Sequence, residues 1–250
     1  NESISFNSHS ISAFTLAEVL ITLGIIGVVA ALLLPNMIAK TQEIVAVNKL
    51  KKAYSVLANG INKAMADNEY SSYSDLFTGG STKEIADRLF AQFNVVDRCI
   101  TSDKKGCGGE YKIKYAEKRN DGKGGIKYIA SGNGERAVLS DGTIISVVVR
   151  GNNSDCKWEY KANKTDAEGN YISDGKGGYE QEDRIAYFCA EIFLDIDGPN
   201  GKNQFGYDNY SVTVTPRTLE QHVSYGNIFD TIRTGKLNYQ TYSLGGKFKD

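Results

Sequence analysis

The cysteines are the side chains whose chemistry can be stated first. The chain has 250 residues and four cysteines, an even count that predicts two disulfides and an oxidising compartment. Successive cysteines are 8, 49 and 33 residues apart, which matches no zinc finger or zinc ribbon pattern. Four cysteines allow three connectivities, and the sequence alone does not choose among them. Our hypothesis pairs Cys99 with Cys107, which closes a tight loop, and Cys156 with Cys189.

Side chains that carry oxygen gather in the segment 195–208, "DIDGPNGKNQFGYD". Calcium binds six to eight oxygens from carboxylates, amides and backbone carbonyls. Pro199 stands where an oxygen ligand is needed and Lys202 adds a positive charge, so the order departs from a regular calcium loop. Two interpretations follow: a calcium site, or a turn whose first two carboxylates accept backbone hydrogen bonds. The candidate ligands are Asp195, Asp197, Asn200, Asn203 and Asp208.

A strongly apolar stretch near the N-terminus contains a carboxylate at Glu18. The 21 residues from Phe14 to Leu34 span the roughly 30 Å of a hydrocarbon core, because a helix rises about 1.5 Å per residue. A carboxylate in lipid costs about 2.5–3.5 kcal/mol on insertion scales, so Glu18 is a functional candidate that needs a partner. The stretch therefore predicts a membrane-spanning helix with a specific role for Glu18.

An amphipathic pattern continues beyond the apolar stretch. Apolar residues between Val47 and Ala64 recur at alternating spacings of 3 and 4, the period of a helix with one apolar face. The spacing predicts one long helix over residues 14–68, with one half in lipid and the other half packed against a head. Gly24, Gly27 and Pro35 mark where this helix can bend.

These residues resemble the N-terminus of type IV pilins and type II secretion pseudopilins. The resemblance covers residues 13–38: Phe14 follows the small residue Ala13, Glu18 lies four residues later, and Pro35 ends the span. It implies that a prepilin peptidase cleaves between Ala13 and Phe14 and methylates the new amine. It also implies that Glu18 pairs with the Phe14 amine of a neighbouring subunit, which neutralises the buried charge.

The resemblance carries further expectations about location and partners. It implies a subunit that resides in the inner membrane with its head outside and then enters a periplasmic or extracellular filament. The lysines that follow the span would by themselves favour the opposite orientation. The expected partners are copies of the chain or related subunits, the prepilin peptidase, an inner-membrane assembly platform, and lipid before assembly. The resemblance does not distinguish a pilus from a secretion pseudopilus, or a major from a minor subunit.

The rest of the chain predicts an α+β head. We expect a leader over 1–13, the long helix over 14–68, and a head over 69–250 in which an antiparallel sheet packs on the helix. The head is expected to begin with a loop over 69–80 and a helix from 82, which a Ser81–Glu84 capping box begins. A hairpin that turns at Asp141-Gly142 follows, and then the strands "IAYFCAEIFLDI" and "NYSVTV". A short helix is expected near 229–233. "DGKGG", at 121–125 and 174–178, is typical of solvated hairpin tips, and the alternative interpretation is a calcium or receptor contact.

Catalysis finds little support in the sequence. After the expected cleavage His222 is the single histidine left, so a triad or a histidine-rich metal site would depend on one weakly patterned segment. The net charge of −1 does not indicate a nucleic-acid partner. We therefore expect no enzyme and no cofactor, apart from the calcium interpretation. The alternative function is a membrane-anchored extracytoplasmic binding protein or enzyme, which would need a span but neither Glu18 nor a cleavage site.

Overall fold

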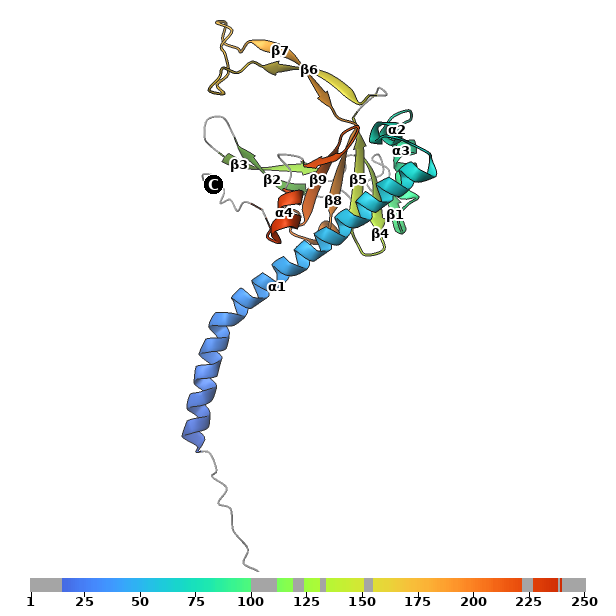
Figure 1. The fold of residues 1–250 in the computed structure, drawn as a ribbon. Helices are drawn as coiled ribbons and strands as arrows, with labels where there is room; N and C mark the ends of the chain where they lie inside the picture. The colour runs from blue at the N-terminus through green and yellow to red at the C-terminus, as the bar shows by residue number, and fades with distance from the viewer. Residues whose placement is uncertain are drawn as a thin grey trace, which may run out of the picture. The chain divides into compact units, whose positions relative to one another are not determined.

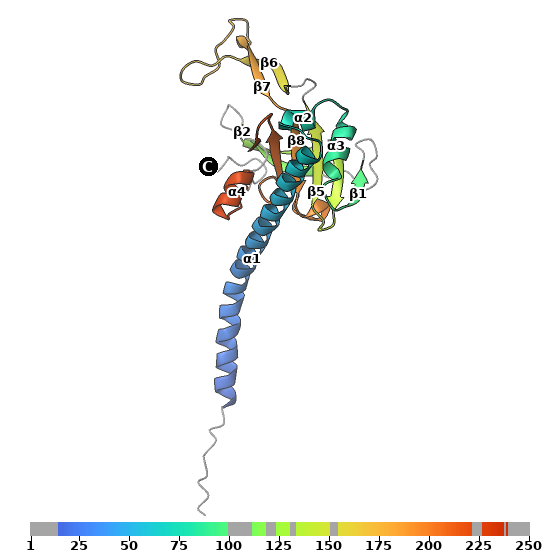
Figure 2. The same cartoon turned by 45° about the vertical axis from the view of Figure 1, so that its right-hand side comes forward.

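The chain has an α+β fold (Figures 1 and 2). The computed structural model describes residues 15–99, 112–118, 124–130, 134–150, 155–221, 227–237 and 239. The helices are α1 (Leu16–Asp67), α2 (Tyr73–Phe77), α3 (Thr82–Phe90), the 3-10 helix η1 (Gly198–Asn200) and α4 (Ile228–Thr234). The strands are β1 (Val95–Cys99), β2 (Lys112–Lys118), β3 (Gly124–Ala130), β4 (Glu135–Leu139), β5 (Ile144–Val149), β6 (Lys157–Asn163), β7 (Gln181–Tyr187), β8 (Ala190–Asp195), β9 (Asn209–Val214) and β10 (Leu219–Gln221).

The helix α1 confirms the prediction of one long N-terminal helix and continues without interruption through Pro35. The chain divides into two compact units, residues 1–43 and residues 44–250, which we call the N-terminal unit and the globular unit. The division falls inside α1, ahead of the predicted head boundary at residue 69. The reason is that the buried positions of α1 all lie between Ala46 and Ala64, where the helix is part of the globular core.

The globular unit is built on a six-stranded sheet with the order β1-β4-β5-β8-β9-β10. All neighbouring strands in it are antiparallel. The hairpin of β4 and β5 turns at Asp141-Gly142, as predicted, and β9 matches the predicted strand "NYSVTV". β5 and β8 are neighbours although β6 and β7 lie between them in the sequence.

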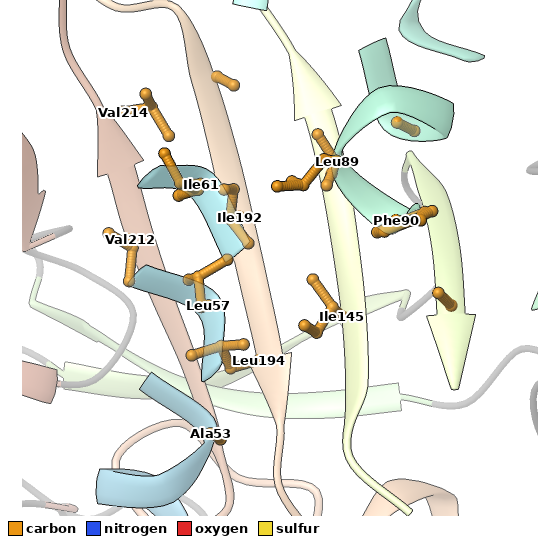
Figure 3. Packing of buried hydrophobic residues seen from close by; sticks show 14 of the residues in the cluster. Ala53, Leu57, Ile61, Leu89, Phe90, Ile145, Ile192, Leu194, Val212 and Val214 are labelled. Carbon is orange, nitrogen blue, oxygen red and sulfur yellow. The ribbon is translucent and has the colours of Figure 1, made fainter. Parts of the chain in front are cut away.

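One apolar core joins α1, α3 and one face of this sheet (Figure 3). Because side chains alternate between the faces of a strand, every second residue of the central strands reaches this core. Leu57 and Ile61 of α1 lie beside Ile192 and Val212 of the sheet, and all four side chains are fully buried. The predicted apolar stripe of α1 is therefore the stripe that packs on the sheet.

Two short helices follow α1, and the sequence indicated only the second. α3 begins at the predicted Ser81–Glu84 capping box, in which each side chain accepts the other residue's backbone N–H. The predicted loop over 69–80 was wrong in part, because it contains the helix α2. Ser72 and Asp75 form an equivalent capping box at its start. The physical signal was the same in both places, a serine followed three residues later by an acid.

β6 and β7 form a separate two-stranded ribbon, visible in Figures 1 and 2. The prediction of one strand over "IAYFCAEIFLDI" was wrong, because the chain leaves β7 at Tyr187 and enters β8 at Ala190. At this break Phe188 donates its backbone N–H to the Cys156 carbonyl, and Cys189 donates to the Val214 carbonyl. The apolar run therefore contributes its first residues to the β6–β7 ribbon and its last residues to the six-stranded sheet. The predicted helix near 229–233 is confirmed as α4.

Candidate functional site

The N-terminal half of α1 presents a continuous apolar surface. Its large apolar side chains from Leu16 to Ile38 are all exposed, the least of them Val19 at 42%. The helix is long and apolar enough to cross a membrane, by length and composition. An apolar surface of this extent needs lipid or other protein around it. This segment is the main candidate for the functional site.

Glu18 caps the N-terminus of α1. Its carboxylate Oε2 accepts hydrogen bonds from the Thr15 backbone N–H at 2.9 Å and from the Thr15 hydroxyl at 2.8 Å. The Glu18 N–H in turn contacts Thr15 Oγ1 at 3.3 Å. This is the reciprocal pattern of a capping box, which satisfies groups that the first helical turn leaves unpaired. The sequence reasoning missed this contact, although the threonine three residues before the glutamate was the signal for it.

The other predicted processing and assembly residues differ in what the structure says of them. Ala13 and Phe14, at the expected cleavage site, lie outside the described residues. Gly24 and Gly27 lie within α1, and a Cβ atom added at either position would meet nothing within 4 Å. No packing inside the described part of the chain therefore requires glycine at these two positions. Pro35 lies within the helix, which continues past it.

Two lysines of α1 bind the loops at one end of the central strands. Lys49 forms an ion pair with Asp197, and Lys52 with Asp141 at 2.8 Å. Burial, the largest influence, raises the pKa of Asp141, but Lys52 and the Thr143 backbone together hold the pKa below its ordinary value. Because the lysines are three residues apart, they lie on the same side of the helix. They connect this helical segment to loops that follow the strands.

The candidate calcium ligands are engaged in ordering their loop. Asp195 accepts hydrogen bonds from the backbone N–H groups of Asp197 and Gly198 at 3.1 and 2.6 Å. Asp208 accepts from Asn203 at 2.8 Å and from Gln204 at 2.7 Å. Asp195 thus has the predicted role of a turn acceptor.

The remaining members of the calcium set lie in different surroundings. Asp197 makes no side-chain cap for η1, contrary to the second interpretation, because its carboxylate pairs with Lys49. Asn200 is exposed at the end of η1. Asn203 Oδ1 is buried without a hydrogen-bond partner among the described residues. The described residues include no group of three His, Cys, Asp or Glu side chains arranged to hold a metal. The calcium site stays a prediction.

The disulfide between Cys156 and Cys189 matches our hypothesis and closes the β6–β7 ribbon at its base. Both cysteines are fully buried in the core. Cys99, at the end of β1, is also disulfide-bonded, while Cys107 lies outside the described residues, so the predicted Cys99–Cys107 bridge stays a prediction. His222 and the first "DGKGG" loop at 121–123 also lie outside them.

The second "DGKGG" lies in the exposed turn that connects β6 to β7. There Asp174 accepts hydrogen bonds from the backbone N–H groups of Lys176 and Gly178, both at 2.8 Å. These bonds hold the pKa of Asp174 below its ordinary value. The contacts are those of a self-contained turn, as the interpretation as a hairpin tip predicts.

No family model, curated protein or solved structure matches the chain. What can be said of its function therefore depends on its own residues and geometry.

Proposed function

We propose that the chain is a structural subunit of a type IV pilus-like or type II secretion filament, a pilin or pseudopilin. The observation that carries the proposal is the division of α1 into two kinds of surface. Its first half exposes apolar side chains on all sides, and its second half buries one face against an antiparallel sheet. A helix of this kind can serve as a membrane anchor and then as the core of a filament, because neighbouring helices can replace the lipid.

The chemical argument for the proposal depends on Glu18. A plain anchor gains nothing from a carboxylate at the end of its apolar segment, where burial in lipid is costly. In the proposed subunit the carboxylate forms an ion pair with the methylated Phe14 amine of the next copy. The local contact with Thr15 keeps the carboxylate hydrogen-bonded before that partner arrives. The subunit would wait in the inner membrane with its head outside until an assembly platform adds it to the filament.

The mature N-terminus tests the proposal directly. We expect filaments sheared from cells to contain the chain, and mass spectrometry of its first peptide to begin at N-methylated Phe14. An Ala13→Asp variant should stay unprocessed in the membrane, whereas an Asn7→Asp variant, which places the same charge further from the cleavage site, should be processed normally. A chain that keeps residues 1–13 and stays in the membrane would support the anchored binding protein or enzyme instead.

A further inference from the structure

Most of the large apolar side chains that the structure describes as exposed in the globular unit lie on one structure. We call residues 156–189 the arm; it comprises β6, β7, the segment between them and the disulfide at its base. Among the residues of the globular unit whose side-chain exposure the structure describes, which leaves out 115–130, the large apolar side chains exposed outside the arm are those of Ile44, Val45 and Val96. The arm exposes six: Trp158, Tyr171, Ile172, Tyr179, Ile185 and Tyr187. Such a concentration marks an interaction site.

The strand register places apolar side chains on both faces of the arm. Trp158 and Tyr160 share one face, with their rings stacked at 5.1 Å. Ile185 and Tyr187 share the other face, and both side chains are more than half exposed. A membrane surface or a polysaccharide strand would cover only one of these faces. The arrangement favours a protein surface that contacts both.

The arm lacks a core of its own. β6 and β7 pair only with each other, and an isolated two-stranded ribbon is marginally stable in water. The Cys156–Cys189 disulfide holds the base of the ribbon covalently, and both sulfur atoms lie in the core of the globular unit. A binding partner would supply the burial that the exposed aromatic side chains lack in the single chain.

Charge indicates where on a partner the arm would bind. The arm carries seven acidic and five basic side chains and is therefore net −2. The part of α1 in the globular unit, residues 44–67, carries four lysines, of which Lys49 and Lys52 already pair with Asp197 and Asp141. Within the described residues, Lys51 and Lys63 are the lysines of this segment that form no such pair. Its exposed residues Ile44, Asn48 and Lys51 follow one another at spacings of 4 and 3, so they form one face. This face offers an apolar side chain and a cation, which complement the aromatic and acidic arm.

We propose that the arm binds a second copy of this chain, on the face of α1 that carries Ile44, Asn48 and Lys51. The inference rests on the proposed function in one respect, that filament assembly brings copies side by side. The two contacting surfaces are different, so the same contact can repeat from copy to copy along a filament. The arm then adds a contact between heads to the contact between the N-terminal helices.

Photocrosslinking in cells that make the full chain tests this inference. Benzoylphenylalanine is introduced at Trp158 on one face of the arm, at Tyr187 on the other, and at exposed Glu220 on β10 as the control. We expect a copy-to-copy adduct from both arm positions, with the attached peptide mapping to residues 44–52. The yield should exceed that of the control about tenfold, equivalent to ~1.4 kcal/mol of preference. A Lys51→Glu change should reduce the adduct, while a Lys63→Glu change, the same charge reversal at an exposed position further along α1, should not.

The outcomes separate this inference from the proposed function. Absence of a copy-to-copy adduct at both arm positions overturns the inference, even when the chain is present in sheared filaments. An adduct with a different protein or with a polysaccharide overturns it as well. Absence of the chain from the filament fraction counts against the proposed function, and an adduct between copies in the membrane would still support the arm contact. Peptide mapping without reduction, which identifies the Cys156–Cys189 bridge in each variant, checks that the base of the arm has formed.

Discussion

At the scale of single residues, Asp141 links the turn of a hairpin to the long helix. Its carboxylate pairs with Lys52 and accepts the Thr143 backbone N–H at 3.2 Å. The pKa of Asp141 is lowered in the folded chain, so its charged form stabilises the fold above its unfolded pKa of about 3.9. This contribution is lost as the pH falls below that value and through the folded pKa. Both side chains are partly exposed, which limits the contribution to less than about 1 kcal/mol.

We therefore expect the free energy of unfolding to depend on Lys52 at pH 7 but much less at pH 3. Urea unfolding of the full chain in detergent, followed by far-UV circular dichroism, measures this difference for Lys52→Ala. The matched control is Lys51→Ala, since no ion pair of Lys51 is seen within the described residues. An equal loss of stability at both pH values would mean that Lys52 acts through packing of its aliphatic stem.

At the scale of secondary-structure elements, Gly60 allows α1 to lie close to the segment after α3. A Cβ atom at this position would overlap the Phe93 ring, with Cζ only 2.6 Å away. Alanine is the better helix former by about 1 kcal/mol, but overpacking of a core typically costs about 1–3 kcal/mol. We expect Gly60→Ala to destabilise the chain by up to about 2 kcal/mol, because the added methyl group forces the Phe93 ring out of its packed position.

A double-mutant cycle separates the two effects in Gly60→Ala. In a Phe93→Ala background the clash is removed, so the same change at Gly60 should be neutral or stabilising. Thermal unfolding of the four chains gives the coupling energy between the two positions. If Gly60→Ala costs the same with and without Phe93, close packing is not the reason for the glycine.

The elements that the sequence predicted well are those with a local signal. Ser81 and Glu84 indicate the start of α3, and Asp141-Gly142 indicates a hairpin turn, because each signal depends on residues within four positions. The boundary between β7 and β8 had no such signal. Phe188 and Cys189 continue an apolar run, and only pairing with the distant residues Cys156 and Val214 ends one strand there and begins the next. The close packing at Gly60 could not be predicted either, because Phe93, which it contacts, is far away in the sequence.

At the candidate site, the sequence located Glu18 but not its contact. The apolar run drew attention to the cost of a buried carboxylate, and the local role of Thr15 was overlooked. In the segment 195–208, the sequence correctly indicated a turn at Asp195. The pairing of Asp197 with Lys49 could not be predicted, because 148 residues separate the two side chains and no local pattern joins them.

At the scale of the whole molecule, Glu18 has one observed role and one proposed role, which substitution can separate. As a helix cap it needs only an acceptor for Thr15, which glutamine can also provide. As an assembly residue it needs a negative charge for the amine of the next copy. Glu18→Gln should therefore keep the helix and its membrane insertion while it abolishes the proposed ion pair. Thr15→Ala should remove the cap hydroxyl, at about 1 kcal/mol, and leave the charge in place.

We expect Glu18→Gln to be processed and inserted normally but to reduce the yield of sheared filaments about tenfold or more, since ~1.4 kcal/mol per contact suffices for that factor. Glu18→Ala should behave in the same way, and Thr15→Ala should assemble nearly as well as the parent chain. Immunoblots of membrane and sheared fractions, normalised to total chain, measure the distribution. The reverse pattern, with normal assembly of Glu18→Gln and loss with Thr15→Ala, would assign the carboxylate to helix capping alone. Glu18 would then have no part in the contact between subunits.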